Sequence, residues 1–443
     1  MLLKRFYDVK LAQASYLIGC QATGEALVVD ANRDVEQYMR SAVAEGVRIA
    51  HVTETHIHAD FVTGSRELAH RTGAALYLSG EGGVDWSYAY APEAGATLLR
   101  DGDTFRAGHV VVRAMHTPGH TPEHICFLVT DSAGADRPMG ILSGDFVFVG
   151  DVGRPDLLER AAKQAGTMQT AARTLFKSLE KFRALPDYLQ LWPGHGAGSA
   201  CGKGLGAVPQ STVGYEKMFN WALAVGSEDE FVPMVLAGQP EPPPYFAHMK
   251  RINKEGPTLL GELPRPRRLA AEQLATLLGA RESASPPVAL VIDIRPAAES
   301  ARGAVPGTFS IPHNKSFTSW AGWLLPYDRD LYLIVGDAGD DAIDEAVRDL
   351  AMIGLDRVAG YFGADSIRAW ASAGRPLDIV REIAVSELAS MLERGAVTEL
   401  DVRAADEWES GHLPGVANIP LGYLTERLDE VPRGSPLVTQ CQG

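Results

Sequence analysis

Four short segments rich in His and Asp occur in this chain, and each follows a run of apolar residues. They are T-H-I-H-A-D-F at 55–61, H-T-P-G-H-T at 116–121, S-G-D at 143–145 and P-G-H-G at 193–196. Apolar runs that end in polar loops are typical of an α/β protein with its chemistry at the strand ends. We therefore expect a sheet to bring these segments together. Two His residues two positions apart can direct both imidazoles at one cation, so the pattern predicts a metal site.

The size and charge of the chain limit the classes of function. A length of 443 residues predicts two to four domains. The net charge of −15, without a basic stripe, argues against nucleic acid as a partner. No run of 18 apolar residues and no export signal are present, which argues against a membrane span. The cysteines are scattered, which indicates reduced thiols and a cytoplasmic protein: Cys20, Cys126, Cys201 and Cys441.

The C-terminal part contains an internal repeat. V-I-D-I-R, ending at Arg295, recurs as E-L-D-V-R, ending at Arg403, and G-A-V-P-G from Gly303 recurs as G-H-L-P-G from Gly411. Both pairs are 108 residues apart. Two matches at one spacing predict two copies of a small α/β domain.

Composition also suggests the domain boundaries. We expect a metal-binding domain at 1–237, a Pro-rich linker at 238–265, and the two repeat copies at 266–376 and 377–443. Residues 157–183 have helical spacing and few helix breakers, which predicts one long helix.

The N-terminal part, over about residues 4–225, resembles the metallo-β-lactamase superfamily, whose motif is H-x-H-x-D-H followed by P-G-H-T, a bridging Asp and a last His. The resemblance implies an αββα sandwich. Phe61 stands where the last His of the first motif is expected. An aromatic ring cannot ligate a metal, which argues against the dinuclear zinc hydrolases of the superfamily.

The resemblance is greatest to the persulfide dioxygenases, which hold one Fe(II). Carried over, the iron ligands are His56, His120 and Asp145, a 2-His-1-carboxylate triad with open positions for O2 and a substrate sulfur. Zinc has no redox chemistry and could not activate O2. The remaining motif residues would orient the ligands by hydrogen bonds: His58, Asp60 and His195.

Three further residues are candidates for substrate binding. Arg154, in G-D-V-G-R-P-D-L, resembles the family's Arg that contacts the substrate carboxylate; the alternative is that it braces the following helix. Cys201 lies in a Gly-rich loop beside Lys203, whose cation would favour a reactive thiolate; an inert loop cysteine is the alternative. Gly196 and Ala197 stand where the glutathione-using members have Asp-Tyr, so coenzyme A or another small thiol competes with glutathione as the carrier.

The repeats resemble rhodanese domains, which carry sulfur on a cysteine. The second copy reaches L-V-T-Q-C, and Cys441 stands at the position of the catalytic cysteine. The sequence ends at Gly443, so this copy is incomplete, and we expect the native chain to continue. The first copy has Asp337 at the cysteine position, which implies an inactive rhodanese.

The two resemblances together imply a sulfide-detoxifying iron persulfide dioxygenase fused to two rhodanese-like α/β domains, in a homo-oligomer. It would oxidise a persulfide with O2 to sulfite and thiol, and sulfur transfer to sulfite would give thiosulfate. Two alternatives stay open. The first is a zinc-dependent thioester hydrolase of the same fold, and the second is a non-catalytic sulfane-sulfur carrier or sensor that uses Cys201 or Cys441.

Overall fold

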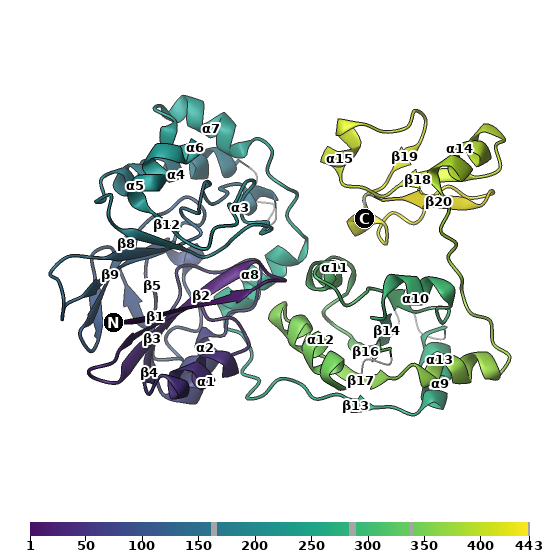
Figure 1. Ribbon diagram of the computed structural model, residues 1–443, viewed down its shortest axis with the longest axis horizontal. Coiled ribbons are helices and arrows are strands. Elements are labelled where there is room, and N and C mark those ends of the chain that lie inside the picture. The colour runs from purple at the N-terminus through teal and green to yellow at the C-terminus, as the bar shows by residue number, and fades with distance from the viewer. Residues whose placement is uncertain (161–165, 283–288, 337–339, 442–443) are drawn as a thin grey trace. The chain divides into compact units, whose positions relative to one another are not determined.

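The computed structural model describes residues 1–443 except 161–165, 283–288, 337–339 and 442–443 (Figure 1). Its described residues form two compact units. Unit 1 comprises Met1–Pro266, Lys315–Ser319 and Asp340–Val358. Unit 2 comprises Arg267–Asn314, Trp320–Gly339 and Ala359–Gly443.

The first sheet of unit 1 has six strands in the order β1-β2-β3-β4-β5-β6. The pairs β1–β2 and β2–β3 are antiparallel, and β3 to β6 are parallel. Its strands are β1 (Leu2–Asp8), β2 (Gln13–Cys20), β3 (Glu25–Val29), β4 (Arg48–Thr53), β5 (Ala75–Ser79) and β6 (Thr97–Leu99).

The second sheet of unit 1 has the order β12-β11-β10-β9-β8-β7. All its pairs are antiparallel except β10–β11, which is parallel. Its strands are β7 (Thr104–Ala107), β8 (Val110–His116), β9 (Ile125–Asp131), β10 (Gly140–Gly144), β11 (Gln190–Pro193) and β12 (Ser211–Thr212).

Three apolar layers hold the sheets and helices of unit 1 together. One core joins the inner faces of the two sheets, through side chains such as Ile18 and Phe127. A second core packs Tyr38 and Leu68 of the helices α1 and α2 onto the first sheet, and a third packs Leu175 of α4 onto the second sheet. Figure 1 shows α1 and α2 on one side of the sheets and α4 to α7 on the other. The expected αββα sandwich is therefore confirmed.

The helices of unit 1 that precede residue 266 differ from the sequence expectation in two places. The single helix expected over 157–183 is wrong, because Gly166, which has a φ of +80°, and Thr167 are not helical and α4 begins at Met168; residues 161–165 lie outside the described residues. The stretch expected as a linker, 238–265, contains the helix α8. The helices are α1 (Glu36–Ala44), α2 (Ser65–Thr72), η1 (Val84–Trp86), α3 (Leu157–Arg160), α4 (Met168–Arg183), α5 (Val213–Phe219), α6 (Trp221–Ala224), α7 (Glu228–Leu236) and α8 (Tyr245–Glu255).

The first repeat copy forms a five-stranded sheet in the order β13-β17-β16-β14-β15. One of its helices, α12, belongs by its contacts to unit 1, so the copy does not separate cleanly at residue 266 as expected. The elements are β13 (Arg267–Arg268), α9 (Ala271–Glu282), β14 (Ala289–Asp293), α10 (Ala297–Arg302), β15 (Phe309–Ser310), α11 (Phe317–Leu324), β16 (Asp330–Ile334), α12 (Asp340–Met352), β17 (Val358–Phe362) and α13 (Asp365–Ser372).

The second copy has three parallel strands in the order β19-β18-β20. Its elements are α14 (Val385–Glu393), β18 (Thr398–Asp401), α15 (Ala405–Ser410), β19 (Ala417–Asn418), η2 (Leu421–Tyr423) and β20 (Leu437–Gln440).

One ion pair recurs in both copies. In the first copy, Arg295 pairs with Asp293 at 2.7 Å and donates to the carbonyl of Gly303. In the second copy, Arg403 pairs with Asp401 at 2.6 Å and donates to the carbonyl of Gly411. Each second-copy residue is 108 positions after its counterpart, which confirms the repeat. None of the described helices is long and apolar enough to cross a membrane.

Candidate metal centre

Strand ends in the two sheets of unit 1 bring three predicted ligands together. His56 follows β4, His120 follows β8 in the P-G-H-T turn, and Asp145 comes directly after β10. One ligand atom from each lies within 4.8 Å of the others. Nε2 of His120 is 3.6 Å from Oδ2 of Asp145, and Nε2 of His56 is 3.9 Å from the same oxygen.

Burial makes this arrangement unfavourable without a cation. His56 is 1% exposed, His120 is 2% exposed and Asp145 is fully buried. Neither carboxylate oxygen of Asp145 has a hydrogen-bond partner among the described residues. Burying a carboxylate without such partners costs free energy of folding. Two imidazole nitrogens also converge on this carboxylate. The donor set therefore fits a divalent metal ion.

Hydrogen bonds on the far side of each imidazole direct its Nε2 into the cluster. Nδ1 of His120 donates to the carbonyl of Arg154 at 2.9 Å. The Thr55 hydroxyl donates to Asp30 at 3.0 Å and thus accepts from Nδ1 of His56 at 3.0 Å. Both rings therefore present the Nε2 lone pair toward Asp145, as metal ligation requires.

The local electrostatics favour the protonation states of metal ligands. Burial, reinforced by the imidazole of His58, holds the pKa of His56 well below its ordinary value. Burial also lowers the pKa of His120, although Asp145 opposes this. For Asp145, burial favours the neutral acid, but the imidazoles of His195 and His120 outweigh it and lower its pKa. Two neutral imidazoles thus face one carboxylate.

His58 lies beside the three-residue cluster, with its ring centre 4.2 Å from that of His56. Its Nε2 lies 3.2 Å from Oδ1 of Asp30. Burial opposes protonation, yet the bond to Asp30 and the charges of Glu54 and Asp60 raise the pKa of His58 to about 9. Its geometry suits the orienting role expected from the sequence, which stays a prediction.

Asp60, His195 and Cys201 form a second group, whose ligand atoms also lie within 4.8 Å of one another. Nε2 of His195 is 3.3 Å from Oδ2 of Asp60 and 3.4 Å from Oδ1 of Asp145. Neither carboxylate oxygen of Asp60 has a hydrogen-bond partner in the described part of the chain. The two groups are therefore adjacent, with Asp145 between them.

The expectation of an activated, accessible thiolate at Cys201 is wrong. Its side chain is 2% exposed, and burial, together with Asp60 and Asp145, raises its pKa well above the ordinary value. Lys203 does not supply the expected cation to it. The Lys203 ammonium donates to the carbonyl of Ala237 at 3.1 Å and lies 4.4 Å from the centre of the Trp221 ring.

Arg154 is fully buried and its guanidinium is already engaged. It makes two parallel bonds of 2.8 Å to Asp156, and its Nη1 donates to the carbonyl of Ala200 at 2.9 Å. Its backbone N–H donates to the carbonyl of Cys201. This geometry favours the bracing alternative over a contact with a substrate carboxylate, because Arg154 holds the Cys201 loop against the cluster.

Comparison with known proteins identifies the fold family. Residues 9–195 match the model of the metallo-β-lactamase superfamily. A crystal structure of a metallo-β-lactamase from Staphylococcus aureus subsp. aureus COL is 44% identical, with a TM-score of 0.73, and the match covers 82% of this chain and 99% of that one. The chain belongs to the metallo-β-lactamase superfamily. Residues 384–443 match a rhodanese-like domain, so this metallo-β-lactamase domain is followed by a rhodanese-like domain at the C-terminus.

Curated relatives of this superfamily member include two kinds of enzyme. The mitochondrial persulfide dioxygenase ETHE1 of Bos taurus is 26% identical over 247 residues, which is 55% of this chain and 84% of the relative. A hydroxyacylglutathione hydrolase of Rhodospirillum rubrum is 30% identical over 180 residues, which is 41% of this chain and 60% of the relative.

Phe61 is the main departure from the superfamily's metal-binding motif. Its side chain is fully buried, and its ring centre lies 4.4 Å from that of His58. A phenyl ring offers no lone pair to a metal ion. The Asp60–His195–Cys201 group therefore lacks one imidazole of the superfamily pattern, with Cys201 as its third donor.

Several supporting residues were not identified from the sequence. Asp30 directly follows β3 and bonds to both Thr55 and His58. An acidic residue at the end of an apolar run was the signal that could have indicated it. His124 accepts a hydrogen bond from the backbone N–H of Asp145 at 3.1 Å. Asn253 bonds to the loop after His58, and no local pattern in the sequence indicated it.

The predicted rhodanese cysteine lies apart from these groups in the sequence. Cys441 follows β20 directly and is exposed. Its role as a sulfur carrier stays a prediction. Asp337, predicted to replace the cysteine in the first copy, lies outside the described residues.

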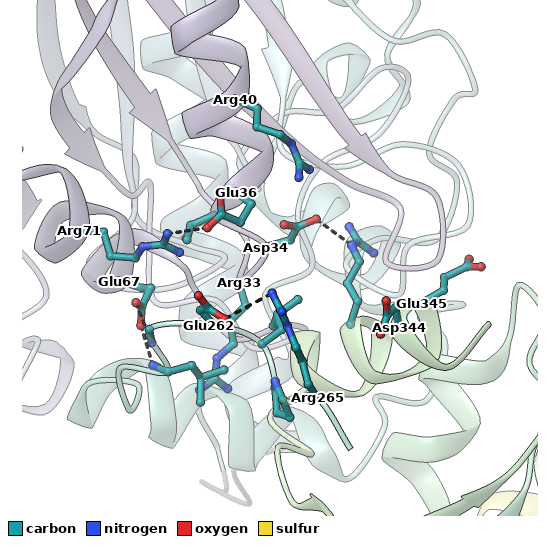
Figure 2. A pocket seen from close by; sticks show the side chains of 16 residues that line it. Arg33, Asp34, Glu36, Arg40, Glu67, Arg71, Glu262, Arg265, Asp344 and Glu345 are labelled. Carbon is teal, nitrogen blue, oxygen red and sulfur yellow. Dashed lines mark hydrogen bonds and ion pairs between the residues drawn. The ribbon is translucent and has the colours of Figure 1, made fainter. Parts of the chain in front are cut away.

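Two cavities of unit 1 differ in character. One, of about 340 Å³, is bounded by Pro118, Gly119 and Pro122 of the turn that carries His120, and by Trp86. The other, of about 760 Å³, is lined by charged residues, several of which pair with one another, as Figure 2 shows for Arg71 with Glu36. The smaller cavity borders the turn that carries His120, but no predicted metal ligand is among the described residues that line it.

Proposed function

We propose that this protein is a non-haem iron persulfide dioxygenase. The observation that carries the proposal is the triad of His56, His120 and Asp145, in which two oriented imidazoles face a buried carboxylate that has no hydrogen-bond partner among the described residues. A 2-His-1-carboxylate set leaves coordination positions open and is the ligand set of non-haem Fe(II) oxygenases. Similarity to the persulfide dioxygenase of Bos taurus supports the same reading.

The proposed reaction converts a persulfide, O2 and water into a thiol, sulfite and two protons (R–S–SH + O2 + H2O → R–SH + SO3²⁻ + 2 H⁺). The sulfur–sulfur bond breaks, and the outer sulfur is oxidised while O2 is reduced. Fe(II), one per chain, would supply the redox chemistry for this step. Glutathione, coenzyme A and other small thiols are the candidate carriers.

The protein's own groups would serve this reaction in two ways. Thr55 and the carbonyl of Arg154 fix the orientation of the two imidazoles. Burial excludes water from the triad, which limits side reactions of a reactive sulfur species.

The rhodanese-like domain suggests a second step. Cys441, exposed after β20, would pass a sulfane sulfur to sulfite and so form thiosulfate. Joining both steps in one chain would raise the effective concentration of the intermediate to the order of millimolar. The protein would thus detoxify sulfide, and the scattered cysteines agree with a cytoplasmic location.

A second candidate is a zinc-dependent thioester hydrolase. The Asp60, His195 and Cys201 group favours it, because a thiolate there could replace the imidazole that Phe61 lacks and complete a second metal position. Similarity to a hydroxyacylglutathione hydrolase agrees with this candidate.

Separate loading of the full chain with iron and with zinc distinguishes the two candidates. The dioxygenase predicts one metal per chain, and persulfide oxidation by the iron form alone. The hydrolase predicts two zinc ions per chain and cleavage of an acylated glutathione or coenzyme A thioester by the zinc form. That second result would replace the dioxygenase as the proposed function.

A further inference from the structure

One buried amide holds the loop that follows His56. Nδ2 of Asn253, on α8, donates to the carbonyls of His58 at 2.8 Å and Phe61 at 2.7 Å. Oδ1 of the same side chain accepts from the backbone N–H of Thr63 at 3.0 Å. Asn253 is fully buried. Both N–H donors of Asn253 and one lone pair of its oxygen are thus used on residues 58–63.

The same loop is held a second time from the end of α12. The backbone N–H of Val62 donates to the carbonyl of Met352 at 2.7 Å. Two residues further on, Gly354 has a φ of +77°, and a Cβ placed there would lie 3.3 Å from Val62 and 3.3 Å from Met249 of α8. The ends of α8 and α12 therefore pack against the loop and against each other.

Ion pairs fix α12 to the rest of unit 1. Arg348 bonds to Asp8 at 2.8 Å and to Asp34 at 2.9 Å, which lie on two different segments near β1 and α1. In a second ion pair, the carboxylate lies on α12: the Lys10 ammonium donates to Asp349 at 2.5 Å. The side chain of Asp349 is 2% exposed, so this pair is shielded from solvent and is stronger than a surface ion pair.

We propose that Asn253 and the segment Asp340–Val358 are positioning elements of the metal site. They fix residues 58–63, and through them the placement of His56 and Asp60 beside Asp145. Asn253 and Met352 both lie beyond residues 9–195, the part that matches the superfamily model. The repeat copy without a cysteine at its active-site position therefore contributes a helix that completes the metal domain.

The inference rests on the proposed metal site but not on dioxygenase activity. Its test measures metal binding by the full chain, with Co(II) as the probe. Asn253→Asp keeps the shape of the side chain but removes both N–H donors and adds a charge next to two carbonyl oxygens. Asn418→Asp is the matched control, because Nδ2 of Asn418 also donates to two backbone carbonyls, those of Asp401 and Arg403, but in the second repeat copy.

We expect Asn253→Asp to raise the dissociation constant of Co(II) about 10-fold or more, and to shift the visible absorption bands of the bound ion. The control variant should keep the parent affinity and spectrum, even if its thermal stability falls equally. Parent affinity and spectrum in Asn253→Asp would overturn the proposal. A parent protein that binds no Co(II) would overturn both this proposal and the metal site. A parent protein that binds Co(II) normally but shows no oxygen uptake with iron would contradict only the dioxygenase function.

A second pair of variants tests α12 and keeps the inference testable if Asn253→Asp does not fold. Arg348→Gln breaks the bonds to Asp8 and Asp34, and it should weaken Co(II) binding in the same direction. Arg295→Gln breaks a buried pair with Asp293 in unit 2, and it should leave the affinity unchanged. Equal affinities in the two variants would contradict the role of α12.

Discussion

Oδ2 of Asp145 lies 3.6 Å from Nε2 of His120 and accepts no hydrogen bond from any described residue. A buried carboxylate in this position is stabilised by charge rather than by hydrogen bonding. Because the backbone N–H of Asp145 donates to His124, the strand end that carries the carboxylate is itself fixed.

Removal of this carboxylate should abolish metal binding. In Asp145→Asn the amide keeps the size of the side chain, but it has no negative charge and is a poor ligand for Fe(II). We expect the iron content of the purified protein to fall from one to less than about 0.1 per chain. Metal analysis checks this, and Asp401→Asn, which alters a buried carboxylate that pairs with Arg403 in the second repeat copy, is the control. Full iron content in Asp145→Asn would contradict the assigned ligand set.

Phe61→His should create a second metal position. The new imidazole would join Asp60 and His195, whose ligand atoms already lie close together. We expect bound zinc to rise from one to two per chain, as measured by elemental analysis after dialysis. A chain that still binds one zinc would show that something other than Phe61 limits the site.

Cys201 should react far more slowly than Cys441. Burial raises the pKa of Cys201 and limits its contact with solvent to 2%, whereas Cys441 is exposed. Because the thiolate is the reactive form, alkylation of the native protein at pH 7.5 should favour Cys441 by more than about 10-fold. Mass spectrometry of the labelled peptides measures the ratio. Equal labelling would contradict the buried position of Cys201.

His58 should make the stability of the metal-free protein depend on pH. Its pKa is about 9 when folded, above its ordinary value of 6.5, so its contribution is fully present below pH 6.5 and is lost as pH rises through 9. The contribution amounts to roughly 3 kcal/mol. His58→Gln should remove this decline in chemical unfolding measured at pH 6 and pH 9.5. The same decline in the variant would mean that another group is responsible.

The sequence predicted the site better than it predicted what surrounds it. The residues His56, His120 and Asp145 could be grouped as candidates because each follows an apolar strand, and one ligand atom from each lies within 4.8 Å of the others. Cys201 was misjudged because a Gly-rich stretch reads as an exposed loop. In the structure, Arg154 draws that stretch inward by bonds to the carbonyls of Ala200 and Cys201.

The contribution of the later segments could not be read from local patterns. Composition predicted a linker at 238–265, yet Pro244 is the N-cap of α8, and Pro suits a helix start because no intrahelical N–H is lost there. Asn253 reaches residues almost 200 positions earlier, at His58. Such contacts depend on tertiary packing, which overrides local propensity.

Oxygen consumption by the iron-loaded full chain tests directly whether the protein is a persulfide dioxygenase. Glutathione persulfide and coenzyme A persulfide would be supplied in parallel, with sulfite and thiosulfate measured. We expect one sulfite, or one thiosulfate derived from it, for each O2 consumed, and no O2 consumption by Asp145→Asn. If protein that holds one iron per chain takes up no oxygen with either persulfide, the proposed dioxygenase function is contradicted.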